Sequence, residues 1–85
     1  MTFETFRDTS DQRVQALKIL EEASELREAA SSLTKGEGSR ERMLDEWADV
    51  MQALANFEAS YGITDAERGD ARIRCYKRNR DRGRY

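Results

Sequence analysis

The stretches KILEEASEL, residues 18–26, and LDEWADVM, residues 44–51, decide the fold predicted for this chain. Both place carboxylates at helical spacing beside apolar residues. These carboxylates are Glu21, Glu22 and Glu25 in the first stretch and Glu46 and Asp49 in the second. Side chains three or four positions apart are neighbours on a helix, so like charges within each stretch repel one another. A divalent cation held between two such helices would turn this repulsion into coordination.

Capping residues around the two stretches predict where the helices begin and end. The first helix is expected from about residue 11 to 34 and the second from about 39 to 61, because short polar side chains start helices and glycine ends them. The expected capping residues are Ser10 or Asp11, Gly36, Ser39 and Gly62. The short turn between the helices predicts an antiparallel hairpin, in which Glu25 and Asp49 lie at the same height.

Two weaker segments flank this hairpin. Residues 1–9 are expected to form an irregular or short helical lead-in that packs on the body through Phe3 and Phe6. Thr64 and Glu67 form a T-x-x-E capping box, which predicts a third helix over about residues 65–79. Its inward-facing candidates are Ile73 and Tyr76. Residues 77–85 are expected to be a basic tail that is frayed unless a ligand orders it.

The sequence therefore predicts an all-α fold in a single domain over residues 1–85, with an antiparallel helical hairpin and a third helix. A chain of 85 residues has a marginal core of its own. The apolar positions of the first helix also cover a wide arc, which indicates contact with more than one neighbour. We expect a helical bundle completed by dimerisation, or by a dimer of dimers.

Composition excludes several classes of function. Histidine is absent and Cys75 is the only cysteine, which excludes histidine-assisted nucleophilic catalysis, an intramolecular disulfide and a cysteine-cluster zinc site. Residues 71–85 carry seven basic side chains and one acidic one, whereas the first seventy carry eight and sixteen. An acidic body with a basic end can bind a metal in one part and anions in the other. No apolar run approaches the length of a membrane span, so we expect a cytoplasmic protein with no membrane partner.

Oxygen ligands without imidazole select hard cations, so the predicted metal is Mg²⁺, with Mn²⁺ as a substitute. Single pairs of helical glutamates are usually solvated surface. Two pairs on facing helices at one height favour a metal site instead. Because Mg²⁺ takes phosphate oxygens as further ligands, a nucleoside triphosphate is the expected partner.

The carboxylate spacing resembles that of the MazG-like all-α nucleoside triphosphate pyrophosphatases. Their signature is E-E-x-x-E, a spacer, and then E-x-x-D. Here it reads EEASE at 21–25 and EWAD at 46–49. The resemblance extends to Lys18 and to a C-terminal K-R-N-x-x-R-G at residues 77–83, which is similar to the phosphate-binding end of small phage-type members.

This resemblance implies hydrolysis of (deoxy)nucleoside triphosphates to the monophosphate and pyrophosphate, as in removal of unwanted nucleotides. It also implies a site at the interface of a homodimer or homotetramer. The implied metal ligands are Glu22, Glu25, Glu46 and Asp49, with Glu21 as an auxiliary catalytic carboxylate. The implied substrate-binding residues are Lys18, Trp47, Lys77, Arg78, Asn79 and Arg82.

Other readings of individual residues stay open. Trp47 could stack on a base, although we favour the core for it. Gln52 and Asn56 could read a base edge, although exposed surface is the preferred reading. Cys75 is interpreted as a packing residue.

Three other functions are compatible with parts of the sequence. Phosphoribosyl-ATP pyrophosphohydrolases share the carboxylate layout but usually carry a histidine where this chain has Ala53. A non-enzymatic helical module could bind nucleic acid through its arginine-rich end, but an acidic body disfavours that partner. A structural dimerisation protein would gain stability when the clustered carboxylates are neutralised. Base, sugar, number of metals and dimer or tetramer are not decided by the sequence.

Overall fold

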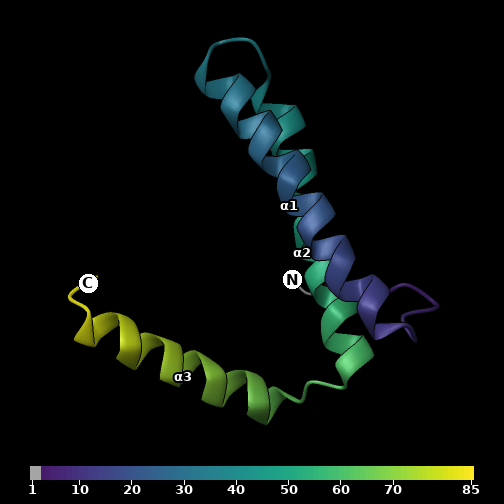
Figure 1. Ribbon diagram of the computed structural model, residues 1–85, viewed down its shortest axis with the longest axis vertical. Coiled ribbons are helices and arrows are strands. Elements are labelled where there is room, and N and C mark those ends of the chain that lie inside the picture. Colours follow the sequence, from purple (N-terminus) through teal and green to yellow (C-terminus); the bar gives the residue numbers. More distant parts are fainter. Residues whose placement is uncertain (1–2) are drawn as a thin grey trace.

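A computed structural model describes residues 3–85 and contains three helices, with no strand in that range. They are α1 (Gln12–Thr34), α2 (Arg40–Tyr61) and α3 (Asp65–Asp81) (Figure 1). The all-α prediction is confirmed. None of these helices is both long and apolar enough to cross a membrane.

Local chemistry sets the ends of α1 and α2. The Asp11 carboxylate accepts hydrogen bonds from the backbone N–H groups of Arg13 and Val14, at 3.1 and 3.3 Å, and so caps α1. Ser39 caps α2 in the same way, and Gly36 in the turn takes a φ of 78°, which favours glycine. The two helices pack against each other as an antiparallel hairpin (Figure 1). Both helix boundaries agree with the predicted ones to within about one residue.

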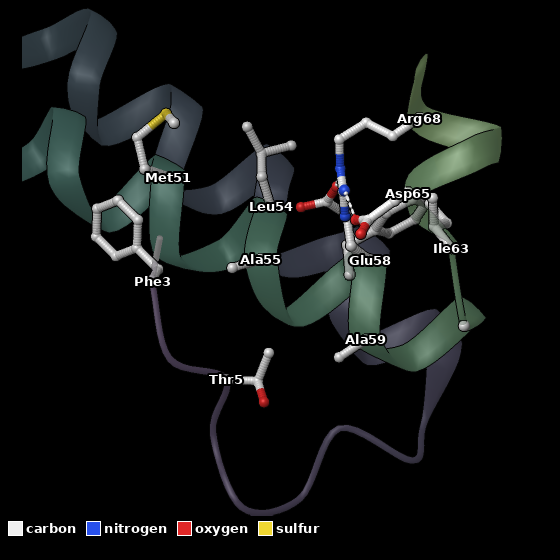
Figure 2. Close-up of a pocket in the computed structure, with 12 residues that line it drawn as sticks. Phe3, Thr5, Met51, Leu54, Ala55, Glu58, Ala59, Ile63, Asp65 and Arg68 are labelled. Atoms are coloured by element: carbon white, nitrogen blue, oxygen red, sulfur yellow. Dashed lines mark hydrogen bonds and ion pairs between the residues drawn. The ribbon is translucent and has the colours of Figure 1, made fainter. Parts of the chain in front are cut away.

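The predicted capping box is present at the start of α3, where the Thr64 side chain accepts from the Glu67 N–H and the Glu67 carboxylate accepts from the Thr64 N–H. Gly62, with a φ of 62°, ends α2 just before it. Helix α3 then points away from the hairpin (Figure 1) and does not pack against α1 or α2. One side chain ties it to α2, because Arg68 Nε donates to Glu58 Oε1 at 2.6 Å (Figure 2).

The C-terminal end differs from its prediction. Helix α3 continues to Asp81, so the first part of the expected frayed tail is helical. Beyond it, Arg84 donates from its backbone N–H to the Asn79 carbonyl at 3.0 Å and from its guanidinium to the Asn79 side chain at 2.9 Å. The Tyr85 ring also stacks on Tyr76, with centroids 5.0 Å apart. The tail is therefore folded back on α3.

A single chain leaves much apolar surface uncovered. Its radius of gyration is 15.4 Å, whereas a compact domain of this length would have about 12 Å. Ile73 and Tyr76 are 54% and 52% exposed, so the prediction that they face inward is wrong within one chain. The preference for Trp47 as core is also wrong, since it is 49% exposed. The cause is the same in both cases, because the faces that carry these residues meet no other helix.

The buried residues of the hairpin are few, and half of them are polar. They are Ala29, Ala53, Gln15 and Asn56. The preferred reading of Asn56 as exposed surface is therefore wrong. An irregular segment before α1 covers it, as predicted, but the Phe6 side chain is 63% exposed, so packing through its ring is not seen. Residues 1 and 2 of the predicted segment lie outside the described range. The Phe6 N–H donates to Asn56 Oδ1 at 3.0 Å, which fixes the segment on α2.

Candidate metal centre

Three carboxylates from two helices meet on the hairpin. Glu22 and Glu25 of α1 and Glu46 of α2 each offer an oxygen, and these oxygens all lie within 4.8 Å of one another. Glu22 and Glu25 share a face because they are three positions apart on one helix. The antiparallel packing of α2 then brings Glu46 opposite them. The predicted convergence of both stretches is thus seen for three of the four proposed ligands.

The carboxylates of this cluster repel one another. Partial burial, followed by the nearby charges of Glu25 and Asp49, raises the pKa of Glu22 above its usual range. Burial and the Glu25 charge raise the pKa of Glu46 as well. One oxygen of Glu46, Oε2, is buried and accepts no hydrogen bond from the residues described. A buried acceptor without a partner is destabilising, so this oxygen requires an explanation.

A hard cation fits this donor set. Mg²⁺ binds oxygen ligands at 2.0–2.1 Å, so ligands on opposite sides of the ion are about 4.2 Å apart. The oxygens of Glu22, Glu25 and Glu46 all lie within 4.8 Å of one another, so side-chain rotations can bring them around one ion. A bound ion would also provide the missing partner of Glu46 Oε2.

The other two carboxylates of the motif lie beside the cluster. The Asp49 charge contributes to the raised pKa values of both Glu22 and Glu46, so it faces the same space. Glu21 is exposed and instead pairs with Lys18, whose Nζ lies 3.1 Å from its Oε2. The hydrogen bond to Glu21 raises the pKa of Lys18, which keeps that ammonium charged.

A cavity of about 360 Å³ adjoins the carboxylates. Lys18, Glu22 and Asp49 line its charged end. The opposite end is lined by the carboxamides of Gln15, Gln52 and Asn56 and by the ring of Phe6. Sequence reasoning did not single out Gln15, although it lies seven positions before Glu22 and therefore two turns away on the same helical face.

The remaining predicted substrate-binding residues are not brought to this site by the same chain. Lys77, Arg78, Asn79 and Arg82 belong to α3 and its end, which extend away from the hairpin (Figure 1). Trp47 follows Glu46 in sequence but is half exposed and does not line the cavity. A site that combines the carboxylates with the basic end therefore needs a second copy of the chain.

A larger hollow, of about 800 Å³, lies elsewhere at the junction of α2 and α3 (Figure 2). Its walls are mainly apolar and include Phe3, Met51 and Leu54. The carboxylates at its edge, Glu58 and Asp65, are both occupied by Arg68. Unlike the site on α1 and α2, this hollow is not lined by a group of three converging carboxylates.

No model of a known protein family matches this chain, and comparisons with curated proteins and with solved structures gave no match. These comparisons therefore assign the chain to no family.

Proposed function

We propose that this chain is a Mg²⁺-dependent nucleoside triphosphate pyrophosphohydrolase. The observation that supports it most directly is the buried, unpartnered oxygen of Glu46 facing two carboxylates of the neighbouring helix. Such an arrangement is unfavourable without a cation and favourable with one. The adjoining cavity has a charged end and an amide-lined end, which suits a ligand that is anionic at one side and polar and planar at the other.

The chain's residues have distinct roles in this proposal. Glu22, Glu25 and Glu46 would hold Mg²⁺, or Mn²⁺ in its place, and Asp49 would complete the set. When bound, the ion supplies positive charge that offsets the charge of the triphosphate and of the departing pyrophosphate. Lys18 borders the cavity and stays protonated, so its ammonium can bind a phosphate oxygen. Water attacks the α-phosphorus. The bond between the α-phosphorus and the oxygen that bridges it to the β-phosphorus breaks, which releases pyrophosphate.

Self-association belongs to the same proposal. Leu17 and Leu20 of α1 are 55% and 65% exposed, and the apolar residues of α3 are uncovered as well. Helices of this length are marginal without tertiary packing, so α3 needs a partner surface. We infer a homodimer, alone or within a tetramer, in which Arg78 and Arg82 of one copy bind the phosphates held by the carboxylates of the other. A nucleotide-hydrolysing role would place the protein in the cytoplasm.

The test is release of pyrophosphate from a panel of canonical and modified (deoxy)nucleoside triphosphates, with and without Mg²⁺. We expect Mg²⁺-dependent release of pyrophosphate and monophosphate, and its loss in Glu46→Gln. Asp45→Asn is the matched control, because Asp45 is the exposed neighbour of Glu46 on α2. Absence of release from every nucleotide by folded, Mg²⁺-supplied protein would refute the proposal.

The exposed α3 favours one alternative, a non-enzymatic module that binds nucleic acid. Its basic side chains are solvent-exposed and unpaired with the acidic hairpin, apart from the Arg68 contact. This alternative predicts binding that weakens steeply with salt. It also predicts that neither Mg²⁺ nor Glu46→Gln changes the affinity.

A further inference from the structure

The carboxamides at the inner end of the cavity have orientations that the backbone determines. The Phe6 N–H can only donate, so the atom of Asn56 that it contacts at 3.0 Å must be the oxygen. The Glu4 carbonyl can only accept, so the atom of Gln52 that lies 2.6 Å from it must be the amide nitrogen. Neither assignment depends on a choice between two equivalent flips.

These contacts leave one defined hydrogen-bonding group on each side chain. The second proton of the Gln52 amide is donated to Asn56 Oδ1 at 3.1 Å, which saturates that nitrogen. The Gln52 oxygen and the Asn56 amide nitrogen have no partner among residues 3–85. The cavity is therefore lined by one free acceptor and one free donor, four positions apart on the same face of α2.

Gln15 adds a third polar group from the facing helix. It is 8% exposed, Asn56 is 4% exposed, and the Gln15 side chain makes no hydrogen bond to the part of the chain described. Of the residues described, only Glu46 and Ser60 have a fully buried side-chain polar atom without a hydrogen bond, so the free amide atoms of Gln15 and Asn56 reach the accessible surface. Unpaired amide groups at the wall of a cavity can bind a polar ligand.

We infer that the amide-lined end of this cavity binds the hydrogen-bonding edge of a nucleobase, with Asn56 donating and Gln52 accepting. This inference rests on the proposed function, because the phosphates of the same nucleotide would lie at the charged end beside Lys18 and Glu22. Each common base offers at least one adjacent acceptor and donor on its Watson–Crick edge. The Phe6 ring, which is 63% exposed and borders the cavity, supplies an aromatic face for stacking.

Asn56→Asp tests the donor selectively. The carboxylate keeps an oxygen for the Phe6 N–H and for the Gln52 amide, so the N-terminal segment stays attached. The group that faces the base changes from donor to acceptor. Two acceptors side by side match two adjacent donors, which among the four common bases only guanine presents on this edge. We expect kcat/KM for dGTP relative to the other three nucleotides to rise about tenfold.

The ratio between nucleotides separates recognition from charge. A new negative charge in the cavity that acts only through repulsion of the triphosphate would lower kcat/KM for all four triphosphates alike and leave the ratios unchanged. Unchanged ratios in an active Asn56→Asp protein would therefore overturn the inference. Absence of activity in both the wild-type protein and the variant would contradict the proposed pyrophosphohydrolase function, not the inference about the base.

Gln15→Leu is the second variant, and it has a readout besides activity. Because Gln15 makes no hydrogen bond to the described residues, we expect this variant to unfold at a higher temperature while kcat/KM falls about tenfold. A lower melting temperature with unchanged kcat/KM would assign Gln15 to the core alone.

Titration with deoxyribonucleosides, followed by NMR of the side-chain amides, tests binding without any reaction. We expect the Asn56 and Gln15 amide resonances to shift at millimolar nucleoside, and that of Gln12, which donates to the Ser60 carbonyl and lies outside the cavity, to stay fixed. This measurement decides the inference even for a protein without pyrophosphohydrolase activity. Absence of shifts at Asn56 and Gln15 would overturn it.

Discussion

The carboxylate of Glu25 on α1 lies within 4.8 Å of the carboxylate of Glu46 on α2, so the hairpin brings like charges together where its two helices meet. Burial of Glu46 and the charge of Glu25 raise the pKa of Glu46. The folded chain therefore favours a state in which a proton or a cation occupies this space. Occupation of this site is therefore expected to change the stability of the protein as well as its activity.

Mg²⁺ should stabilise the protein through this cluster. An ion that binds only the folded state at a hundred times its Kd raises the free energy of unfolding by about 2.7 kcal/mol. We expect a rise in melting temperature on addition of Mg²⁺ to the wild-type protein, and none in Glu46→Gln. Asp45→Asn should respond as the wild type does, since Asp45 lies outside the cluster. Equal shifts in all three proteins would show that Mg²⁺ acts elsewhere.

The contribution of the carboxylate cluster to the stability of the metal-free protein should fall as pH rises through the carboxylate range. Glu22 and Glu46 have folded-state pKa values above the ordinary 4.5, so the folded state keeps protons that the unfolded state releases. Their contribution to stability is complete below 4.5 and is lost as pH passes the raised values. The pKa values of Asp8 and Glu67 are lowered by hydrogen bonds, and their contributions change in the opposite direction.

A double variant isolates the contribution of the cluster. Glu22→Gln with Glu46→Gln removes the two raised pKa values and leaves Asp8 and Glu67 in place. In urea denaturation with chelator, at one protein concentration, the double variant should match the wild type near pH 4 and be the more stable protein near pH 7. A difference that is constant across this range would mean that the carboxylates do not interact in the folded state.

Replacement of glycine by alanine should have opposite effects on stability at Gly62, between α2 and α3, and at Gly69, within α3. Gly62 has a φ of 62°, so Gly62→Ala should destabilise the end of α2 by about 1–2 kcal/mol. Gly69 lies within α3, and a Cβ there would meet open space, so Gly69→Ala should stabilise that helix by about 0.5–1 kcal/mol. Amide hydrogen exchange at the end of α2 should become faster in the first variant, and that of α3 should become slower in the second. Slower exchange in both would contradict the assigned geometry of Gly62.

Sequence reasoning succeeded where the cause is local and failed where it lies in the tertiary structure. Asp11 caps α1 because a short carboxylate reaches the next free amides, and that chemistry needs only neighbouring residues. The three clustered carboxylates followed from helical spacing and one short turn. Asn56 was misread because its burial depends on the N–H of Phe6, fifty positions away. Tyr76 was misread because an apolar position does not reveal whether another surface covers it.

The basic end of α3 gives the sharpest test of a site shared between two copies. Within one chain, Arg78 lies on α3 and Arg82 directly follows it, and α3 extends away from the carboxylates (Figure 1). If the partner copy supplies them, Arg78→Ala with Arg82→Ala should raise KM for triphosphates strongly, because charge-assisted contacts to phosphate are lost. The measurement is steady-state kinetics with the best substrate of the panel.

Mixing two defective variants distinguishes a shared site from a site within one chain. A mixed dimer of Glu46→Gln and the double arginine variant has one site with both defects and one with neither, provided that carboxylates and arginines come from different copies. An equal, fully exchanged mixture contains half mixed dimers, so it should regain about a quarter of wild-type activity at limiting substrate. A site built within one chain gives no such recovery, since every site then carries one of the two defects. Unchanged kinetics in the double arginine variant itself would exclude α3 from phosphate binding.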